Sequence, residues 1–276
     1  MDKCTYVSFG GAGVHGFAYL GSLQKYFPRA DKFSAWRDAL QGIGGVSSGT
    51  IIALALVLRM SLDEIKDFVE RFPLTDILFK DSTGTVNDFM TGHGKGFLSG
   101  LSLSFIAQTL LIERQIDPAI SLRGLHDLGF PDFRVLVVDL ATQTPRVLSF
   151  ATEPDMPVHL AMRASMTVPV LFHAVQWKGQ ILVDGACEEY RGAGLFADVP
   201  FIETKYVAFS VEYWITTPPT TDLLYVVLSL SRYMMRKTVP NAKYWIKIDT
   251  SEYSHPLNLF SFDPDALIEA GHNASL

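Results

Sequence analysis

The chain has 276 residues, of which 48% are hydrophobic and 19% are charged, and its formal net charge at pH 7 is −6. This length and composition are typical of one folded domain with a sizeable core, so we expect a single domain over residues 1–276 and no long disordered segment. The net negative charge argues against nucleic acid as a partner, because nucleic-acid binding depends on lysine and arginine side chains that neutralise phosphates.

Strands and helices alternate along the chain, as the spacing of the apolar residues indicates. Ser61 and Glu64 stand in the pattern of a capping box, which marks the start of a helix, and Gly129 suits the end of one. The turn of a hairpin is predicted at Lys178 and Gly179. The predicted elements are, in chain order, a strand at 5–10, a helix at 18–27, a strand leading into the glycines near 45, a helix after them, helices at 61–72, 104–116 and 122–129, strands at 133–140 and 145–150, a helix near 157–167, a hairpin over 174–185, a segment at 205–212, a helix around 222–235, and segments at 244–249 and 265–271.

This alternation predicts a three-layer α/β fold with a mainly parallel central sheet. Residues 73–100 are rich in glycine and aromatic residues and form the least regular part of the sequence. The two cysteines, Cys4 and Cys187, are too few for a disulfide framework. The N-terminal residues lack the pattern of a signal peptide, and no apolar run approaches the ~20 residues that span a bilayer, so we expect an intracellular, cytoplasmic protein.

Residues Gly45-Val46-Ser47-Ser48-Gly49 match the pattern G-x-S-x-G with Ser47 at its centre. A serine presented at a sharp turn between a strand and a helix takes a strained backbone, and glycines on either side avoid collisions of neighbouring Cβ atoms. The helix that follows would direct its N-terminal N–H groups at the serine, where they favour developing negative charge. Ser47 is therefore a candidate nucleophile, and the alternative is a tight glycine turn that only packs a helix on a sheet.

The stretch from Gly11 to Gly16 follows the first predicted strand and opens a helix. Backbone N–H groups in such a loop can bind an anion, so Gly11, Ala12 and Gly13 are candidate donors of an oxyanion hole. The same stretch matches the dinucleotide-binding pattern G-x-G-x-x-G, which requires an acidic residue at the end of a second strand. Asp31 stands at the right distance but without a preceding strand, so a nucleotide-binding protein is the weaker alternative.

A serine nucleophile also needs a base. In a Ser-Asp-His triad with the chain order of the α/β-hydrolases, the histidine would follow Asp184, which leaves only His255 and His272. Both are interpreted more simply as surface histidines. Only 46 residues precede Ser47, which is fewer than that fold needs ahead of its nucleophile.

Three motifs, SFGGAGVHGFAYLGSL, GVSSG and VDGA, occur in an order that resembles the patatin-like phospholipases, a family of lipid acyl hydrolases. The resemblance covers about residues 4–190, whereas residues 191–276 match only loosely. The stretch ASMTVPVLF is similar to the family's A-S-x-A-x-P stretch, with Thr167 where alanine is usual. The resemblance implies the patatin-like fold and a Ser-Asp dyad in which Ser47 is the nucleophile and Asp184 the base. The residues that would support this site are His15, Gly16, Gly45, Gly49, Gly185 and Ala186.

The resemblance also implies an acyl-enzyme mechanism. Asp184 would take the proton of Ser47 during attack on the ester carbonyl and would then activate the water that hydrolyses the acyl-enzyme. A partly desolvated carboxylate is a better base near neutral pH, because burial raises its pKa. His15 stands where the family has arginine or lysine, so a charge at this position would be present only in part above pH ~6.5.

We therefore expect a lipid acyl hydrolase, of the phospholipase A or lipase type, that acts on lipid esters at a membrane or droplet surface and needs no metal or cofactor. A soluble esterase or thioesterase on the same site is the alternative enzyme. A non-catalytic lipid binder on the same fold is a further alternative. Asp139, His173 and Cys187 lie near the motifs and are expected to be structural.

Overall fold

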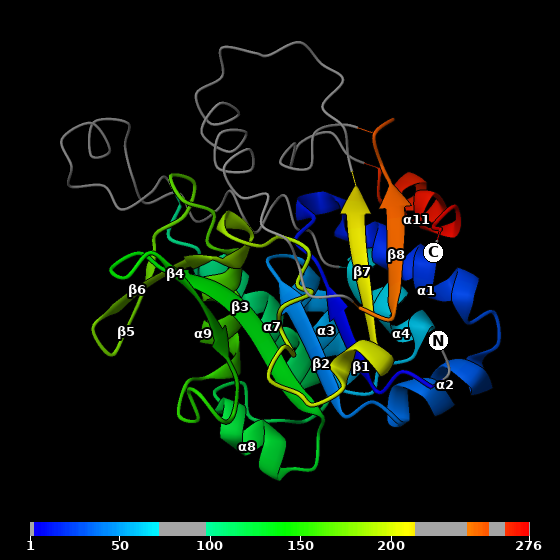
Figure 1. The fold of residues 1–276 in the computed structure, drawn as a ribbon. Helices are drawn as coiled ribbons and strands as arrows, with labels where there is room; N and C mark the ends of the chain where they lie inside the picture. The colour runs from blue at the N-terminus through cyan, green and yellow to red at the C-terminus, as the bar shows by residue number, and fades with distance from the viewer. Residues whose placement is uncertain (1–2, 72–97, 213–241, 254–262, 276) are drawn as a thin grey trace.

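The computed structural model describes residues 3–71, 98–212, 242–253 and 263–275, which form a single α/β domain (Figure 1). Its strands are β1 (Tyr6–Phe9), β2 (Gly42–Val46), β3 (Asp132–Asp139), β4 (Thr144–Leu148), β5 (Val175–Trp177), β6 (Gln180–Asp184), β7 (Tyr206–Glu212) and β8 (Tyr244–Asp249). They form one sheet with the order β5-β6-β3-β2-β1-β7-β8, and β4 pairs with β3. The strands from β3 to β8 in this order are parallel, whereas β4 and β6 run antiparallel to β3. The predicted α/β fold with a mainly parallel central sheet is confirmed.

The α-helices contribute their apolar faces to one main core. In Figure 1, α1, α3, α4 and α7 lie behind the sheet, and the core between them includes Val7, Ile43 and Val135, which have no exposed surface. The α-helices of the described residues are α1 (Ala18–Tyr26), α2 (Ala30–Asp38), α3 (Gly49–Val57), α4 (Leu62–Arg71), α7 (Leu101–Glu113), α8 (Leu122–Asp127), α9 (Val158–Met166) and α11 (Pro264–His272).

The other face of the sheet has a smaller core. Here Leu136 and Tyr206 of the sheet pack with Phe196, which comes from the irregular segment 185–204 that crosses the front of the sheet in Figure 1. This segment contains two 3₁₀ turns, η2 (Gly185–Cys187) and η3 (Ile202–Thr204). In the part of the chain that the structure describes, the third layer is therefore an irregular segment rather than a layer of helices.

Local signals in the sequence placed several elements correctly. Ser61 Oγ accepts a hydrogen bond from the Glu64 N–H at 3.1 Å, and the Ser61 N–H donates to Glu64 Oε2 at 2.7 Å, which confirms the capping box. The hairpin between β5 and β6 turns at Lys178 and Gly179, with φ of 46° and 81°. Gly129, with φ of 84°, follows the end of α8. Each of these features depends on residues close together in the chain.

Two helices differ from the expectation. Helix α2 was not predicted, and it is held by Phe33 and Trp36, whose rings pack against Phe27. Helix α7 begins three residues earlier than predicted, because Gly100 with φ of 74° turns the chain into it. The predicted helix around 222–235 and residues 73–97 of the irregular stretch lie outside the described residues.

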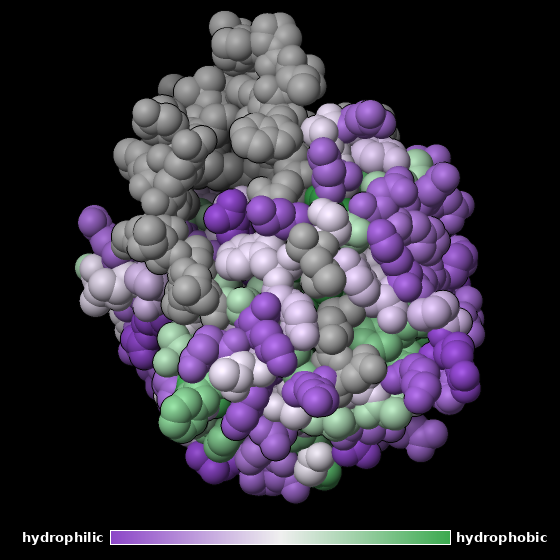
Figure 2. Space-filling view, turned by 45° about the vertical axis from the view of Figure 1, so that its right-hand side comes forward, coloured by the Kyte–Doolittle hydropathy of each residue, from purple (hydrophilic) through white to green (hydrophobic). Residues whose placement is uncertain are grey.

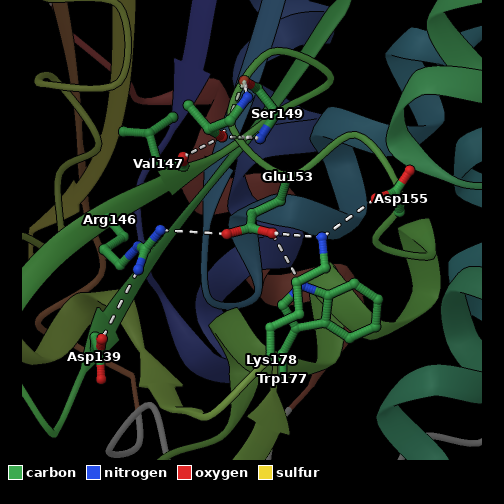
Figure 3. A network of polar contacts seen from close by, with 9 residues as sticks. Asp139, Arg146, Val147, Ser149, Glu153, Asp155, Trp177 and Lys178 are labelled. Atoms are coloured by element: carbon green, nitrogen blue, oxygen red, sulfur yellow. Dashed lines mark hydrogen bonds and ion pairs between the residues drawn. The ribbon is translucent and has the colours of Figure 1, made fainter.

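A buried carboxylate anchors the hairpin whose second strand ends at Asp184 (Figure 3). Glu153 is 5% exposed, and its oxygens accept hydrogen bonds from Arg146 at 3.2 Å and from the Trp177 indole at 3.0 Å. The Lys178 ammonium lies 3.6 Å from the same carboxylate. The contacts join β4 and the loop after it to β5 and the hairpin turn, so this carboxylate ties the hairpin to the rest of the domain.

We predict that Glu153→Gln lowers the free energy of unfolding by about 2 kcal/mol, because its amide N–H group would face donors where an acceptor is needed. Urea unfolding followed by circular dichroism measures the change. Asp155→Asn is the matched control, since Asp155 also faces Lys178 but its side chain is 76% exposed, and a loss below about 0.5 kcal/mol is expected there. Equal losses in the two variants would contradict an anchoring role for Glu153.

Candidate active site

The predicted nucleophile lies at a sharp turn between β2 and α3. Ser47 has φ of 51°, a left-handed conformation that is uncommon for residues other than glycine. A Cβ atom on Gly45 would lie 2.5 Å from the Thr50 Cα, and one on Gly49 would lie 2.4 Å from the Phe9 carbonyl oxygen. The two glycines are therefore required by close approach of the backbone, as the motif predicts. The N-terminus of α3 follows this turn directly.

Ser47 and Asp184 meet where the ends of β2 and β6 come together beside β3. The Ser47 Oγ donates a hydrogen bond of 2.7 Å to Asp184 Oδ2, although the residues are 137 positions apart in the sequence. Strand β3 pairs with β2 up to Leu136 and with β6 from Val137 onward, both along one edge, because β4 pairs with the opposite edge. Strand β2 ends just before Ser47 and β6 ends at Asp184, so the two strand ends meet beside β3. The two residues are 8% and 2% exposed, respectively. The structure thus brings together the two residues that the family resemblance pairs.

The second carboxylate oxygen of Asp184 is used to hold its own turn. Asp184 Oδ1 accepts a hydrogen bond of 2.8 Å from the Ala186 N–H. A Cβ on Gly185 would lie 2.3 Å from the Leu136 carbonyl oxygen, so only glycine fits where the chain passes β3. Gly185 and Ala186 therefore fix the orientation of the carboxylate, which leaves Oδ2 directed at Ser47.

The backbone of Asp184 is held by Thr167, the residue that stands where the family usually has alanine. The Asp184 N–H donates to the Thr167 carbonyl at 3.0 Å. Thr167 has no exposed surface, and its hydroxyl donates to the Arg163 carbonyl of α9 at 2.7 Å. Threonine is accommodated in place of alanine because this carbonyl satisfies its hydroxyl group.

The glycine loop packs directly on the serine. A Cβ on Gly11 would lie 3.3 Å from the Ser47 Cβ and 3.1 Å from the Ala186 Cβ, and Gly13 has φ of 55°. The Gly11 N–H donates to the Tyr190 carbonyl at 2.5 Å, and the Ala12 N–H donates to Ser48 Oγ at 3.2 Å. Two of the three predicted oxyanion donors thus have partners within the protein in this structure. The assignment of Gly11, Ala12 and Gly13 to an oxyanion hole remains a prediction.

His15 connects the glycine loop to the end of the edge strand β8. It lies in the 3₁₀ turn η1 (Gly13–Phe17), is 1% exposed, and its Nδ1 is 2.7 Å from the Thr250 Oγ1 just past the end of β8. A Cβ on the next residue, Gly16, would lie 3.2 Å from the Ser48 Oγ. His15 therefore supports the loop from a buried position, and a role for its charge in the reaction remains a prediction.

Tyr190 was not identified from the sequence. Its carbonyl is brought to Gly11 by a segment that Glu189 organises, since a Glu189 oxygen accepts a hydrogen bond from the Arg191 N–H at 2.7 Å. Burial raises the pKa of the Glu189 carboxyl above its usual range. The Arg191 guanidinium lies 5.4 Å from the centre of the Trp245 ring. No sequence motif marks these contacts.

Other residues near the motifs take part in ordinary folded structure. Asp139 Oδ1 accepts a hydrogen bond of 3.0 Å from the Ala141 N–H. Asp31, which the nucleotide-binding alternative requires at a strand end, lies on α2 and pairs with Arg29 on the surface. His272 is exposed and its Nε2 lies 3.1 Å from Gln24, whereas His255 falls outside the described residues.

Within the described residues, no group of three or more histidine, cysteine, aspartate or glutamate side chains is arranged to hold a metal ion. None of the helices seen there combines the length and the apolar character needed to cross a membrane.

Comparison with known proteins identifies one family and one fold. The family model described as patatin-like phospholipase matches residues 7–202. The uncharacterized protein R571 of Acanthamoeba polyphaga mimivirus is 27% identical over 180 residues, which are 65% of this chain and 57% of that protein. Among solved structures, VipD from Legionella pneumophila superposes with a TM-score of 0.61 at 13% identity, covering 98% of this chain and 66% of VipD. ExoU of Pseudomonas aeruginosa, in its heterodimeric complex with SpcU, gives a TM-score of 0.51 at 14% identity and covers 98% of this chain and 50% of that one.

The chain is thus shorter than the proteins it resembles. It spans 57% of the viral relative and 66% of VipD, and half of ExoU. At 13% and 14% identity, the likeness to VipD and ExoU shows that the fold is shared.

Proposed function

The chain belongs to the patatin-like phospholipase family, and from this premise we propose that it is a lipid acyl hydrolase that uses Ser47 as nucleophile and Asp184 as base. The observation that carries the proposal is the 2.7 Å hydrogen bond from Ser47 Oγ to Asp184 Oδ2. A nucleophilic hydroxyl needs a base within hydrogen-bond reach, and this contact meets that requirement. The strained backbone of Ser47 supports the same role, because strain of this kind is concentrated at functional sites.

In the first half of the reaction, Ser47 Oγ attacks the ester carbonyl while its proton passes to Asp184 Oδ2. The tetrahedral intermediate carries negative charge on the former carbonyl oxygen, which the N–H groups of Gly11, Ala12 and Gly13 stabilise together with the N-terminus of α3. In the structure, the Gly11 N–H donates a hydrogen bond to the Tyr190 carbonyl and the Ala12 N–H donates one to the Ser48 hydroxyl. When substrate binds, each of these two N–H groups leaves its present acceptor and donates to the oxyanion instead. Collapse of the intermediate expels the alcohol, which takes the proton from Asp184.

In the second half, water hydrolyses the acyl-enzyme. Asp184 Oδ2 accepts a proton from the water as its oxygen attacks the acyl carbonyl. The second tetrahedral intermediate collapses, the bond to Ser47 Oγ breaks, and Oγ regains a proton from Asp184. A fatty acid leaves, and the Ser47–Asp184 contact is restored. The cycle needs no metal or cofactor.

A lipid surface as the location of the substrate is supported by α7. Leu101, Phe105 and Ile112 project from this helix with 60%, 50% and 55% of their surface exposed, and α7 has no charged residue before Glu113. The Arg163 side chain of α9 donates to the Ser99 carbonyl just before α7, so the helix starts beside the elements that hold the dyad. The side of the molecule with α11 is, by contrast, mostly hydrophilic (Figure 2).

Labelling with a fluorophosphonate tests the proposed nucleophile. Such a probe phosphorylates an activated serine, so intact mass should show one adduct on the wild-type protein and none on Ser47→Ala. Ser48→Ala is the neighbouring control and should still be labelled, because it retains Ser47 and Asp184. A folded wild-type protein without an adduct, or an adduct that persists in Ser47→Ala, would contradict the proposal and favour a non-catalytic lipid binder or a nucleotide-binding protein.

Ester hydrolysis measured across the aggregation threshold of the substrate then separates the two enzyme types. A lipid hydrolase that works at an interface shows a large increase in rate once the ester aggregates. A smooth saturation curve through the threshold would instead indicate a soluble esterase.

A further inference from the structure

The buried serine at the end of α9 contacts both the nucleophile and the central sheet. Ser165 has no exposed surface. Its Oγ accepts a hydrogen bond of 2.9 Å from the Ser47 N–H and donates one of 2.7 Å to the Leu136 carbonyl of β3. The hydroxyl of Ser165 thus acts both as donor and as acceptor within the protein, and the hydrogen bond that it accepts comes from the backbone of the nucleophile.

The hydroxyl stands where β2 leaves the sheet. Val46 is the last residue of β2 and pairs with Leu136 in the parallel register. The next residue, Ser47, turns into the left-handed conformation, so its N–H no longer continues the ladder. Ser165 bridges the gap, because it links the Leu136 carbonyl to the Ser47 N–H. Buried backbone groups require such partners, and without the hydroxyl both would be left without one.

The same helix end also holds the other member of the dyad. Two residues after Ser165, the Thr167 carbonyl accepts the hydrogen bond from the Asp184 N–H. Residues 165–167 therefore contact the backbone of Ser47 on one side and the backbone of Asp184 on the other. The separation between Ser47 Oγ and Asp184 Oδ2 depends on this short segment.

We infer that Ser165 is a positioning residue, which fixes Ser47 at the distance and angle to Asp184 that proton transfer requires. The inference rests on the proposed function, since it concerns the same dyad. Ser165 touches neither substrate nor the transferred proton. It acts through the Ser47 backbone, and its loss lets the strained turn relax away from the base.

Ser165→Ala is expected to lower the rate constant of fluorophosphonate labelling by about 10- to 100-fold, because a displacement of about 1 Å at a reacting group has effects of this size. The final extent of labelling should remain one adduct per chain. This separates positioning from folding, since a loss of folded protein lowers the extent of labelling and leaves the rate constant of the folded fraction unchanged. With a soluble p-nitrophenyl ester, kcat should fall by a similar factor while KM stays near the wild-type value.

Ser22→Ala is the matched control. Ser22 also has no exposed surface, and its hydroxyl has no hydrogen-bond partner in the described residues. It lies on α1, outside the dyad, so its removal should leave the labelling rate unchanged. Ser165→Cys is the second variant, because a thiol is a weak donor and a weak acceptor and should restore part of the rate. If Ser165→Ala does not fold, Ser165→Cys is compared with wild type instead. We then expect labelling of Ser165→Cys to be several-fold slower than that of wild type and still to reach one adduct per chain.

The two possible failures are distinguishable. In the first failure, the wild-type protein is labelled and Ser165→Ala has the same rate constant as wild type. If the alanine variant does not fold, the same rate constant in Ser165→Cys is the equivalent result. Either result would overturn the positioning role and leave the dyad intact. A folded wild-type protein that is not labelled at all would overturn the proposed function and this inference with it.

Discussion

Replacement of Asp184 by asparagine is expected to reduce kcat for ester hydrolysis by about 10³-fold or more, the effect of removing a general base from a serine nucleophile. The substitution keeps the size of the side chain. Its amide oxygen accepts from the Ala186 N–H, as Oδ1 does now, so the amide NH₂ group is directed at Ser47 Oγ. An NH₂ group donates a hydrogen bond there and cannot take the serine proton.

The measurement is kcat with a p-nitrophenyl ester, together with the rate of fluorophosphonate labelling. Asp139→Asn is the matched control, because Asp139 is equally buried and also accepts a hydrogen bond from the N–H two residues further along. It lies at the end of β3, which neighbours β6, and Ser47 is not among its hydrogen-bond partners. That variant should retain activity close to wild type. A similar loss in both variants would show that Asp184 acts through folding rather than as the base.

Gly21→Ala is expected to lower the free energy of unfolding by about 3 kcal/mol, although alanine favours a helix over glycine by about 1 kcal/mol. Gly21 lies where α1 crosses α11. A Cβ at this position would lie 1.7 Å from the Ile268 carbonyl oxygen, which belongs to the backbone of α11 and cannot rotate away. The two helices must therefore separate, and buried contacts between them are lost.

Urea unfolding followed by tryptophan fluorescence measures this loss. Gly194→Ala is the control, because a Cβ there meets no atom within 4 Å and the position does not have a positive φ. Its stability should stay within about 0.5 kcal/mol of wild type. Because α1 follows η1 of the glycine loop, Gly21→Ala should also slow fluorophosphonate labelling. A Gly21→Ala protein as stable as wild type would mean that α11 does not pack on α1 at this distance.

Much of the site was predictable because its signals are local. The spacing of Gly45, Ser47 and Gly49 identified the turn, and the left-handed conformation of Ser47 agrees with the strain that the pattern implies. The capping box at Ser61 and the hairpin turn at Lys178 were placed for the same reason, since each depends on side chains within a few residues. The pairing of Ser47 with Asp184 came from the family resemblance, because periodicity alone pointed to no base.

The elements that were not predicted depend on contacts between distant segments. Helix α2 is held by rings that pack on Phe27, and its own sequence has a weak helical pattern. The Tyr190 carbonyl reaches Gly11 from the segment just after η2, which is far from Gly11 in the sequence. Ser165 lies in a stretch that resembles the family, but no sequence pattern indicates that its hydroxyl accepts a hydrogen bond from the Ser47 N–H.

The sequence by itself determined the family, the order of most strands and helices, and the candidate nucleophile, because glycine spacing and apolar periodicity act over a few residues. The candidate base followed from the family resemblance. Only the tertiary structure decided which further groups hold the two residues in place. The contact of Ser165 with Ser47 spans 118 positions, and the close approach of Gly21 to α11 joins the first helix to the last. Such contacts depend on how the elements pack across the sheet, and the same local pattern is compatible with many packings.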